Sequence, residues 1–168
     1  MSFKEIKPEA ILENPFKLIG TDWTLISAQS NGKTNTMTAS WGFLGIMWHL
    51  PVVEIFIRPQ RYTKEFVDHE DYFSLTFFND DYRNTLNYLG TVSGRDENKI
   101  DKSDLTLAYE NDVPYFKEAK LVLICKKLYV DKLKEENFLD KSLVIENYGD
   151  KDFHSCYFAK IEKVLIKE

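Results

Sequence analysis

The chain has 168 residues, of which 43% are apolar and 29% charged, and this balance excludes bulk disorder and a collagen-like fibre. Its length is typical of one domain, so we expect a single domain over residues 1–168. The formal net charge of −5 argues against a general binder of nucleic acid or of an anionic membrane surface.

The distribution of apolar residues and cysteines gives expectations for the compartment. Charged residues from Lys4 onward leave the N-terminus without the apolar stretch of a secretory signal. The most apolar uncharged segment, residues 43–53, is shorter than the ~20 residues that a membrane span needs. Cys125 and Cys156 lie far apart, which excludes a disulfide framework and a Cys-rich zinc site. We therefore expect a cytoplasmic protein without a membrane-spanning segment.

The pattern of apolar residues predicts six strands along the chain, with clear alternation of apolar and polar residues in the second, third and fourth. Asn31-Gly32 predicts a tight hairpin turn between the first two. The expected strands are Trp23–Gln29, Thr34–Trp41, Val52–Arg58, Tyr72–Phe78, Leu121–Tyr129 and His154–Ile166.

The predicted helices are short and few. Thr63 is a candidate N-cap for a helix running to about Asp71. Asp81 is a candidate cap for a second helix, with Gly90 as its stop. A third helix around residues 140–148 competes with a loop. Because strands outnumber helices and do not alternate with them, we expect a mainly β, mostly antiparallel barrel with short peripheral helices.

The first candidate for a ligand site is a segment without charge. Residues 34–53 contain no Asp, Glu, Lys or Arg, whereas a window of that length should hold about six at the average for this chain, so the segment is expected inside the protein or at an interface. Thr36, Thr38 and Ser40 form a hydroxyl row on one strand face, opposite Met37, Ala39 and Trp41. From the pattern alone, a solvent-facing row or small residues under a neighbouring strand is favoured over a ligand-binding row.

The second candidate is the basic segment Arg58-Pro59-Gln60-Arg61-Tyr62-Thr63-Lys64. Its cations lie at a strand end and just before a predicted helix, where free amides, the helix dipole and arginine forks together favour a phosphate. The alternative is a solvated turn that pairs with Glu65, Asp68 or Glu70. The sequence does not choose between them.

The remaining candidates are weaker. Ser93-Gly94-Arg95-Asp96, with Lys99 three positions on, predicts a tight turn with two cations, which a plain surface loop also has. His49 and His69 are expected to be structural or exposed, Cys125 an inert core thiol, and His154 a satisfied polar residue. The chain has no GxGxxG, P-loop, GxSxG or HExxH motif. The sequence therefore argues against a Rossmann dinucleotide site, a Walker nucleotide site and the sites of two major hydrolase classes.

Taken in order, three motifs resemble the flavin reductase-like family of FMN-binding split barrels, with the flavoredoxin branch most similar. They are residues 35–42 (NTMTASWG), residues 57–63 (IRPQRYT), and residues 93–96 (SGRD) with Lys99. The resemblance runs from about Pro15 to the C-terminus. It implies a six-stranded antiparallel split barrel that forms a homodimer and holds FMN non-covalently near the subunit interface.

The resemblance also implies which residues would contact the cofactor. The flavin would do the redox chemistry itself, so no catalytic protein residue is expected, and Lys99 is the candidate to stabilise the reduced, anionic ring. The cofactor-binding residues implied are Asn35, Thr36, Met37, Thr38, Ser40, Trp41, Arg58, Arg61, Tyr62, Thr63, Ser93, Gly94, Arg95, Lys99 and His154. The function expected is an NAD(P)H-dependent flavin reductase. The alternatives are a flavoredoxin-type carrier that exchanges electrons with a redox protein, and a binding module without redox turnover.

Overall fold

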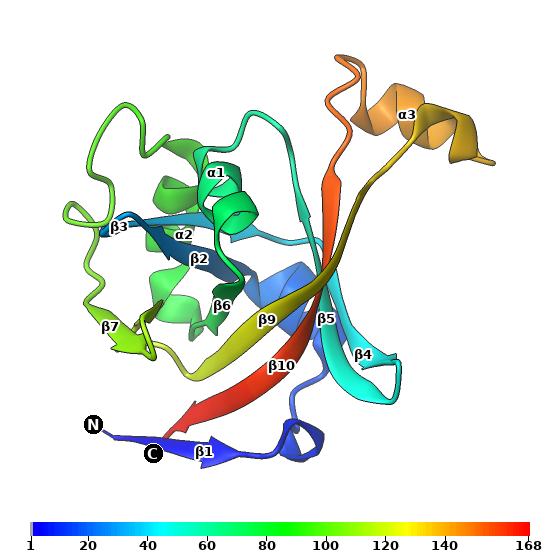
Figure 1. The fold of residues 1–168 in the computed structure, drawn as a ribbon. Helices are drawn as coiled ribbons and strands as arrows, with labels where there is room; N and C mark the ends of the chain where they lie inside the picture. The colour runs from blue at the N-terminus through cyan, green and yellow to red at the C-terminus, as the bar shows by residue number, and fades with distance from the viewer. Residues whose placement is uncertain (1) are drawn as a thin grey trace.

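The computed structural model describes residues 2–168 as a mainly β protein (Figure 1). Its main sheet has eight strands, all paired antiparallel, in the order β3-β2-β6-β9-β10-β5-β4, with β1 paired to the far part of β10. The strands are β1 (Phe3–Ile6), β2 (Thr24–Ser30), β3 (Lys33–Ala39), β4 (Gly42–Met47), β5 (Leu50–Ile57), β6 (Tyr72–Phe77), β9 (Leu121–Lys132) and β10 (Ser155–Lys167).

All six strands expected from the sequence are present, and the expected fold class is confirmed. The main sheet contains two further strands, β1 and β4, and a separate hairpin is formed by β7 (Leu107–Glu110) and β8 (Val113–Phe116). Strand β4 shows no alternation in sequence, because its residues are mostly apolar on both faces. The turn between β4 and β5 uses Trp48 and His49 at φ 53° and 59°, an arrangement normally signalled by Asn or Gly.

Two packed clusters stabilise the sheet. One lies between its curved halves and includes Ile26, Val53 and Phe73. The other lies between the sheet, the β7–β8 hairpin and the segment around α2, and includes Leu25, Leu86 and Phe116. The strand order leaves β3 and β4 at opposite ends of the sheet, and no backbone pairing joins them within residues 2–168. The barrel is therefore open along β3.

The helices begin and end at residues that differ slightly from the prediction. Helix α1 begins at Tyr62, so Thr63 is not its N-cap; Arg61 occupies that position and makes no side-chain capping bond. A 3-10 turn holds Asp81, and Gly90 lies inside α2. The helical segments are η1 (Pro8–Ala10), η2 (Lys17–Asp22), α1 (Tyr62–His69), η3 (Asp80–Tyr82), α2 (Arg83–Thr91), η4 (Glu135–Asn137) and α3 (Ser142–Asn147).

The segment between β9 and β10, residues 133–154, projects beyond the sheet and carries α3, away from α1 and α2 (Figure 1). We call it the α3 arm. Within residues 2–168, no helix is long and apolar enough to cross a membrane.

Candidate functional site

A cavity of about 240 Å³ opens along the free edge of β3, and we call it the β3-edge cavity. Strand β3 pairs only with β2, and an edge strand leaves a row of backbone N–H and C=O groups available to another molecule. Strand β5, the segment before α1, and the start of β10 supply the other walls. The lining residues are Met37, Thr38, Ala39, Ser40, Trp41, Phe56, Arg58, Arg61 and His154.

Arg61 is the cation best placed to hold an anion in this cavity. Its Nη1 donates to the Gly90 carbonyl at 2.6 Å, and this is the one hydrogen bond of its side chain within residues 2–168. A guanidinium carries five N–H donors, so most of its donors remain unpaired. Burial, with the nearby Arg58 charge, lowers the pKa of Arg61. Both effects penalise the isolated cation, and a bound anion would relieve them.

Arg58 lines the same cavity but is already bonded within the chain. Its Nη1 pairs with Asp152, and its Nη2 donates to the Asn147 carbonyl at 2.9 Å. Its guanidinium also lies over the Tyr148 ring, 5.2 Å from the centroid. Arg58 therefore fastens the α3 arm to β5 and has fewer free donors for a ligand than Arg61.

His154 lies at the entrance to β10, with its ring 5.2 Å from that of Trp41. Its Nδ1 is 2.8 Å from the Tyr148 hydroxyl. Burial, reinforced by the Arg58 charge, lowers the pKa of His154 to about 4. The imidazole is thus neutral near pH 7, and one hydrogen bond joins its Nδ1 to the Tyr148 hydroxyl.

The hydroxyl row does not act as one surface. Thr36 is fully buried and contacts the Ser27 hydroxyl at 2.8 Å, while Thr38 donates to the Leu86 carbonyl under α2. Ser40 alone keeps its hydroxyl free of intrachain partners within the described chain. Thr36 therefore bonds to the neighbouring strand β2, whereas Thr38 bonds to α2.

The third motif lies in a separate place, which we call the Gly94 loop (residues 93–99). Gly94 packs directly on Asn35 and, at 3.2 Å from an added Cβ, on Tyr62. Asn35 in turn donates from Nδ2 to the Thr63 hydroxyl at 2.9 Å, and both side chains are buried. A second cavity of about 360 Å³ is lined by Asn35, Tyr62, Gly94 and Lys99. The structure therefore places seven of the expected cofactor residues at the β3-edge cavity and four at this second cavity. The remaining four, Thr36, Thr63, Ser93 and Arg95, line neither cavity.

The cations of the Gly94 loop are satisfied by the chain itself. Lys99 is buried and donates to the Leu89 and Val92 carbonyls at 2.6 and 2.8 Å, at the C-terminal end of α2. Burial, with the Arg61 charge, lowers its pKa to about 8. Arg95 pairs with Glu65 and donates to the Gln60 carbonyl at 3.0 Å.

For the Gly94 loop and the basic segment, the sequence left open either a ligand site or an ordinary surface turn, and most of their side chains serve the turn. The backbone amide of Arg95 donates to the Ser93 hydroxyl at 3.2 Å, so the Ser93 side chain stabilises the turn. Lys64 pairs with Asp68 at 2.6 Å, as the solvated-turn alternative expects. Arg61 forms no such pair among residues 2–168, so it alone in the segment keeps the character of an anion site.

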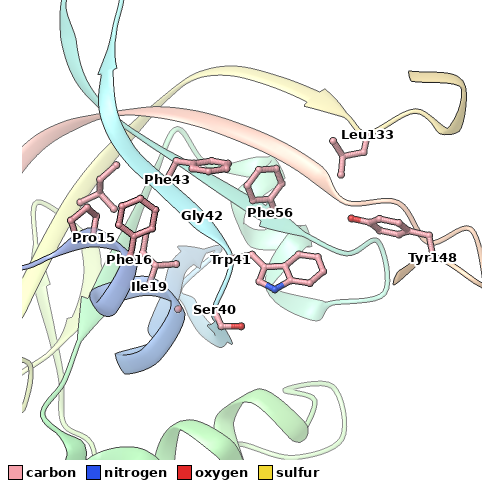
Figure 2. Close-up of a pocket in the computed structure, with 12 residues that line it drawn as sticks. Pro15, Phe16, Ile19, Ser40, Trp41, Gly42, Phe43, Phe56, Leu133 and Tyr148 are labelled. Carbon is pink, nitrogen blue, oxygen red and sulfur yellow. The ribbon is translucent and has the colours of Figure 1, made fainter. Parts of the chain in front are cut away.

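One feature near the site was missed from the sequence. A cavity of about 460 Å³, which we call the apolar cavity, adjoins the β3-edge cavity, and Ser40, Trp41 and Phe56 line both (Figure 2). Its walls come from the N-terminal segment, residues 40–42 of the first motif, β4, β5 and the α3 arm. The first motif and the charge-free window were therefore the available signals. The lining residues are Pro15, Phe16, Ile19, Gly20, Ser40, Trp41, Gly42, Phe43, Leu44, Phe56, Leu133 and Tyr148.

The other candidates have structural environments. Cys125 is fully buried, and burial raises the pKa of its thiol, which confirms the expected inert core cysteine. His49 and His69 are exposed. No group of three or more His, Cys, Asp or Glu residues placed to hold a metal ion is found in residues 2–168.

Comparisons with solved structures show the fold. The FMN-binding domain of a flavin reductase-like enzyme from Shewanella baltica OS155 is 16% identical, with a TM-score of 0.72 over 98% of this chain and 77% of that one. An FMN-binding protein from Thermus thermophilus, with bound p-hydroxybenzaldehyde, is 18% identical, with a TM-score of 0.68 over 98% and 82%. Flavoredoxin from Methanosarcina acetivorans is 20% identical, with a TM-score of 0.67 over 100% and 77%. The split-barrel architecture is therefore confirmed.

Comparison with curated protein sequences gave no significant match. The family model described as "Flavin reductase like domain" matches residues 16–145, which include β2 to β6, the β3-edge cavity walls from those strands, and the Gly94 loop. That match covers well over half of the chain. The chain belongs to the flavin reductase-like domain family.

Proposed function

We propose that the chain, as one FMN-binding unit, holds FMN along the β3 edge and passes electrons from NAD(P)H through the bound flavin to an acceptor. The observation that carries this proposal is Arg61, a largely buried cation with one intrachain hydrogen bond in the described chain, beside an open strand edge. Family membership and the structural neighbours described as FMN-binding proteins support it.

The chemistry of the donor set fits this cofactor. FMN has an anionic phosphate, a polar ribityl chain and a flat ring whose edge accepts and donates hydrogen bonds. The cavity offers a guanidinium, an edge strand with free backbone groups, and the aromatic side chains Trp41 and Phe56. When bound, the flavin supplies the hydride and electron chemistry.

In this mechanism, the residues of the chain bind the cofactor and orient it. Arg61 would hold the phosphate, assisted by the unpaired amides at the start of α1. The free edge of β3 would fix the polar edge of the ring by backbone hydrogen bonds. His154, uncharged near pH 7, would offer its Nε2 for a hydrogen bond without adding a charge to the cavity.

Lys99 was expected to stabilise the reduced, anionic flavin ring, and its hydrogen bonds limit the donors that it has for this role. Its ammonium donates to two carbonyls at the end of α2, so one of its three N–H donors is left for a ligand, against four in Arg61. We therefore assign Arg61, and not Lys99, as the principal cation toward the cofactor.

A flavoredoxin-type electron carrier is the second candidate function. It is favoured by the exposure of Trp41, 47% of which is open to solvent beside the cavity, because a protein partner needs such an approach to a bound flavin. Flavoredoxin is also among the structural neighbours.

We also propose that the chain forms a homodimer. Strand β4 exposes Phe43 and Ile46 by 62% and 73%, and Trp48 follows it in the turn. Exposed apolar surface of this kind marks an interaction site. Light scattering at micromolar concentration should report about twice the chain mass of 19.7 kDa; the mass of one chain would contradict the proposal.

An absorption spectrum of the protein mixed with FMN, before and after NADH is added without oxygen, tests the function. A reductase should bleach the flavin bands in a protein-dependent way with NADH or NADPH. A carrier should bind FMN but be reduced only by a redox protein or dithionite. A protein that leaves free FMN unperturbed, by spectrum and by calorimetry, would contradict both candidates.

A further inference from the structure

Strand β4 forms the second free edge of the main sheet, at the opposite end from β3, and among the described strands it pairs with β5 alone. Figure 1 shows it at the outer end of the sheet, away from α1 and α2. In an edge strand, alternate residues direct their N–H and C=O groups away from the single neighbour. Gly45 in the middle of β4 is exposed and has no side chain, so the backbone of the strand itself is open to solvent.

The sequence of β4 lacks the features that protect an edge strand. Soluble proteins commonly block such an edge with a charged side chain, a proline or a bulge. The other edge strands of the main sheet carry charge, since Lys33 begins β3 and β1 contains Lys4 and Glu5. Strand β4 contains no charged residue and no proline, and its pairing with β5 over residues 42–47 has no bulge. An unprotected edge of this kind is expected to be covered by another strand.

The exposed apolar side chains of β4 lie on both faces of the sheet. Phe43 and Met47 point to one face and Ile46 points to the other, because successive residues of a strand alternate. Their exposed fractions are 62%, 38% and 73%, respectively. A partner packed flat against the sheet would cover one face and leave the other open. A strand added along the edge would cover side chains on both faces.

A second copy of this chain supplies a strand that matches this edge. A twofold axis perpendicular to the sheet would place β4 of one subunit antiparallel to β4 of the other, which is the direction of the strand pairs within the main sheet. Because β4 has no charge, no like charges would meet across the axis. A charged peptide strand would instead bury its charges against Phe43 and Ile46 without a counter-charge.

We propose that two copies of this chain pair edge to edge through antiparallel β4 strands, so that one sheet runs continuously across the dimer. The inference rests on the homodimer proposed above and adds the strand, its direction and the backbone contact; it does not depend on FMN. The pairing satisfies the outward N–H and C=O groups of residues 42–47 and covers Phe43 and Ile46 together.

Hydrogen exchange of the parent protein, followed by mass spectrometry, tests the backbone contact. The exchange of residues 42–47 is compared between a concentrated sample, in which the protein is dimeric, and a sample diluted until light scattering reports one chain. We expect about half of these amides, those that point away from β5, to exchange at least about tenfold more slowly in the dimer. The amides of β1, another edge strand, should exchange equally in both samples.

Phe43→Lys and Ile46→Lys separate edge pairing from face packing, because the two side chains lie on opposite faces. Both are exposed, so both variants should fold. In an edge-paired dimer each variant brings lysines of both subunits to the paired strands, so each should raise the dimer Kd at least about tenfold, measured by analytical ultracentrifugation. Leu12→Lys is the matched control, since that side chain is 95% exposed on the N-terminal segment outside β4, and it should change the Kd by less than about twofold.

The outcomes separate this inference from the two proposals above. A dimer in which residues 42–47 exchange as fast as in the monomer would overturn edge pairing, as would a dimer that only one of Phe43→Lys and Ile46→Lys weakens. An equal loss in Leu12→Lys would also overturn it, because added charge alone would explain the effect. A parent protein with the mass of one chain at every concentration would contradict both the homodimer and its pairing. A dimer with the expected exchange that binds no FMN would support the pairing and contradict the proposed function.

Discussion

The β3-edge cavity and the Gly94 loop contain similar residues, since each has an arginine and a further basic side chain. In the cavity, Arg61 makes one intrachain hydrogen bond and keeps most of its donors free within the described chain. In the loop, Lys99 donates to two helix carbonyls and Arg95 is paired with Glu65. Two similar basic motifs thus supply one largely unpaired cation, Arg61, whereas Arg58, Lys99 and Arg95 are already bonded within the chain.

The contrast between Arg61 and Lys99 indicates which cations remain available to a ligand. Lys99 lies at the C-terminal end of α2, where unpaired carbonyls attract a positive charge. Arg61 precedes the N-terminal end of α1, where free amides repel a cation and attract an anion. The side chain of Arg61 nevertheless also donates to a carbonyl in the last turn of α2, that of Gly90. The two cations therefore differ chiefly in how many donors the chain uses: one of five in Arg61 and two of three in Lys99.

The largest predicted effect concerns His154 in the cavity. Its pKa is about 4 in the folded protein and 6.5 for an unperturbed imidazole, so between these values the unfolded state binds a proton that the folded state does not. Stability should therefore fall as pH drops from 6.5 to 4, by up to about 3 kcal/mol in total. His154→Gln should lose this dependence, measured by urea unfolding across that range.

His69→Gln is the matched control, because His69 is exposed at the end of α1. It should retain the pH dependence of the parent protein. If His154→Gln and the parent protein lose stability in parallel between pH 6.5 and 4, the buried neutral imidazole assigned to the cavity is wrong.

The next effect concerns Gly94, where the loop contacts the strand. An added Cβ would meet the Asn35 side chain, which cannot move without losing its hydrogen bond to Thr63. Gly94→Ala should therefore cost about 1–2 kcal/mol, measured by thermal or urea unfolding. Gly149→Ala has nothing within 4 Å of its new methyl group and should change stability by less than about 0.5 kcal/mol. Equal effects would contradict the tight contact.

The smallest effect concerns the fastening of the α3 arm. Asp152→Asn weakens its pairing with Arg58 and Gln60, so the arm should open more often. We expect tryptic cleavage within residues 133–154 to rise about twofold to fivefold, with FMN affinity unchanged within about twofold. Asp140→Asn, which touches only Ser142 on the same arm, should not accelerate cleavage. A large loss of FMN affinity in Asp152→Asn would instead place Arg58 in the cofactor site.

Most of the sheet could be predicted from the sequence, because several strands alternate in polarity, the start of β9 is a continuous apolar run, and Asn31-Gly32 gives a recognisable hairpin turn. Strand β4 could not, because it is apolar on both faces and its turn uses Trp48 and His49 in place of Asn or Gly. The start of α1 was expected two residues late, because Thr63 has the chemistry of an N-cap but uses its hydroxyl to accept from Asn35, and Arg61 is the N-cap.

The candidate site was predicted as one set of residues and is found as two. A strand residue's position in sequence fixes its face but not the element that covers that face, so Thr36 and Thr38 could not be separated from Ser40. The partners of Arg58 and Lys99 come from the α3 arm and from backbone carbonyls, neither of which carries a sequence signal. The apolar cavity is built from segments that are far apart in the chain, so it became visible only in three dimensions.

The most direct test of the cofactor site is a fluorescence titration of FMN and riboflavin against the parent protein, Arg61→Ala and Arg95→Ala. A charge-assisted hydrogen bond is worth roughly 1.5–3 kcal/mol, so Arg61→Ala should weaken FMN binding by about ten- to a hundredfold. Riboflavin lacks the phosphate and should barely respond. Arg95→Ala should change either affinity by less than about twofold, because its guanidinium already pairs with Glu65. If Arg61→Ala weakens both ligands equally or neither, or if Arg95→Ala matches it, the assignment of the phosphate to the β3-edge cavity is contradicted.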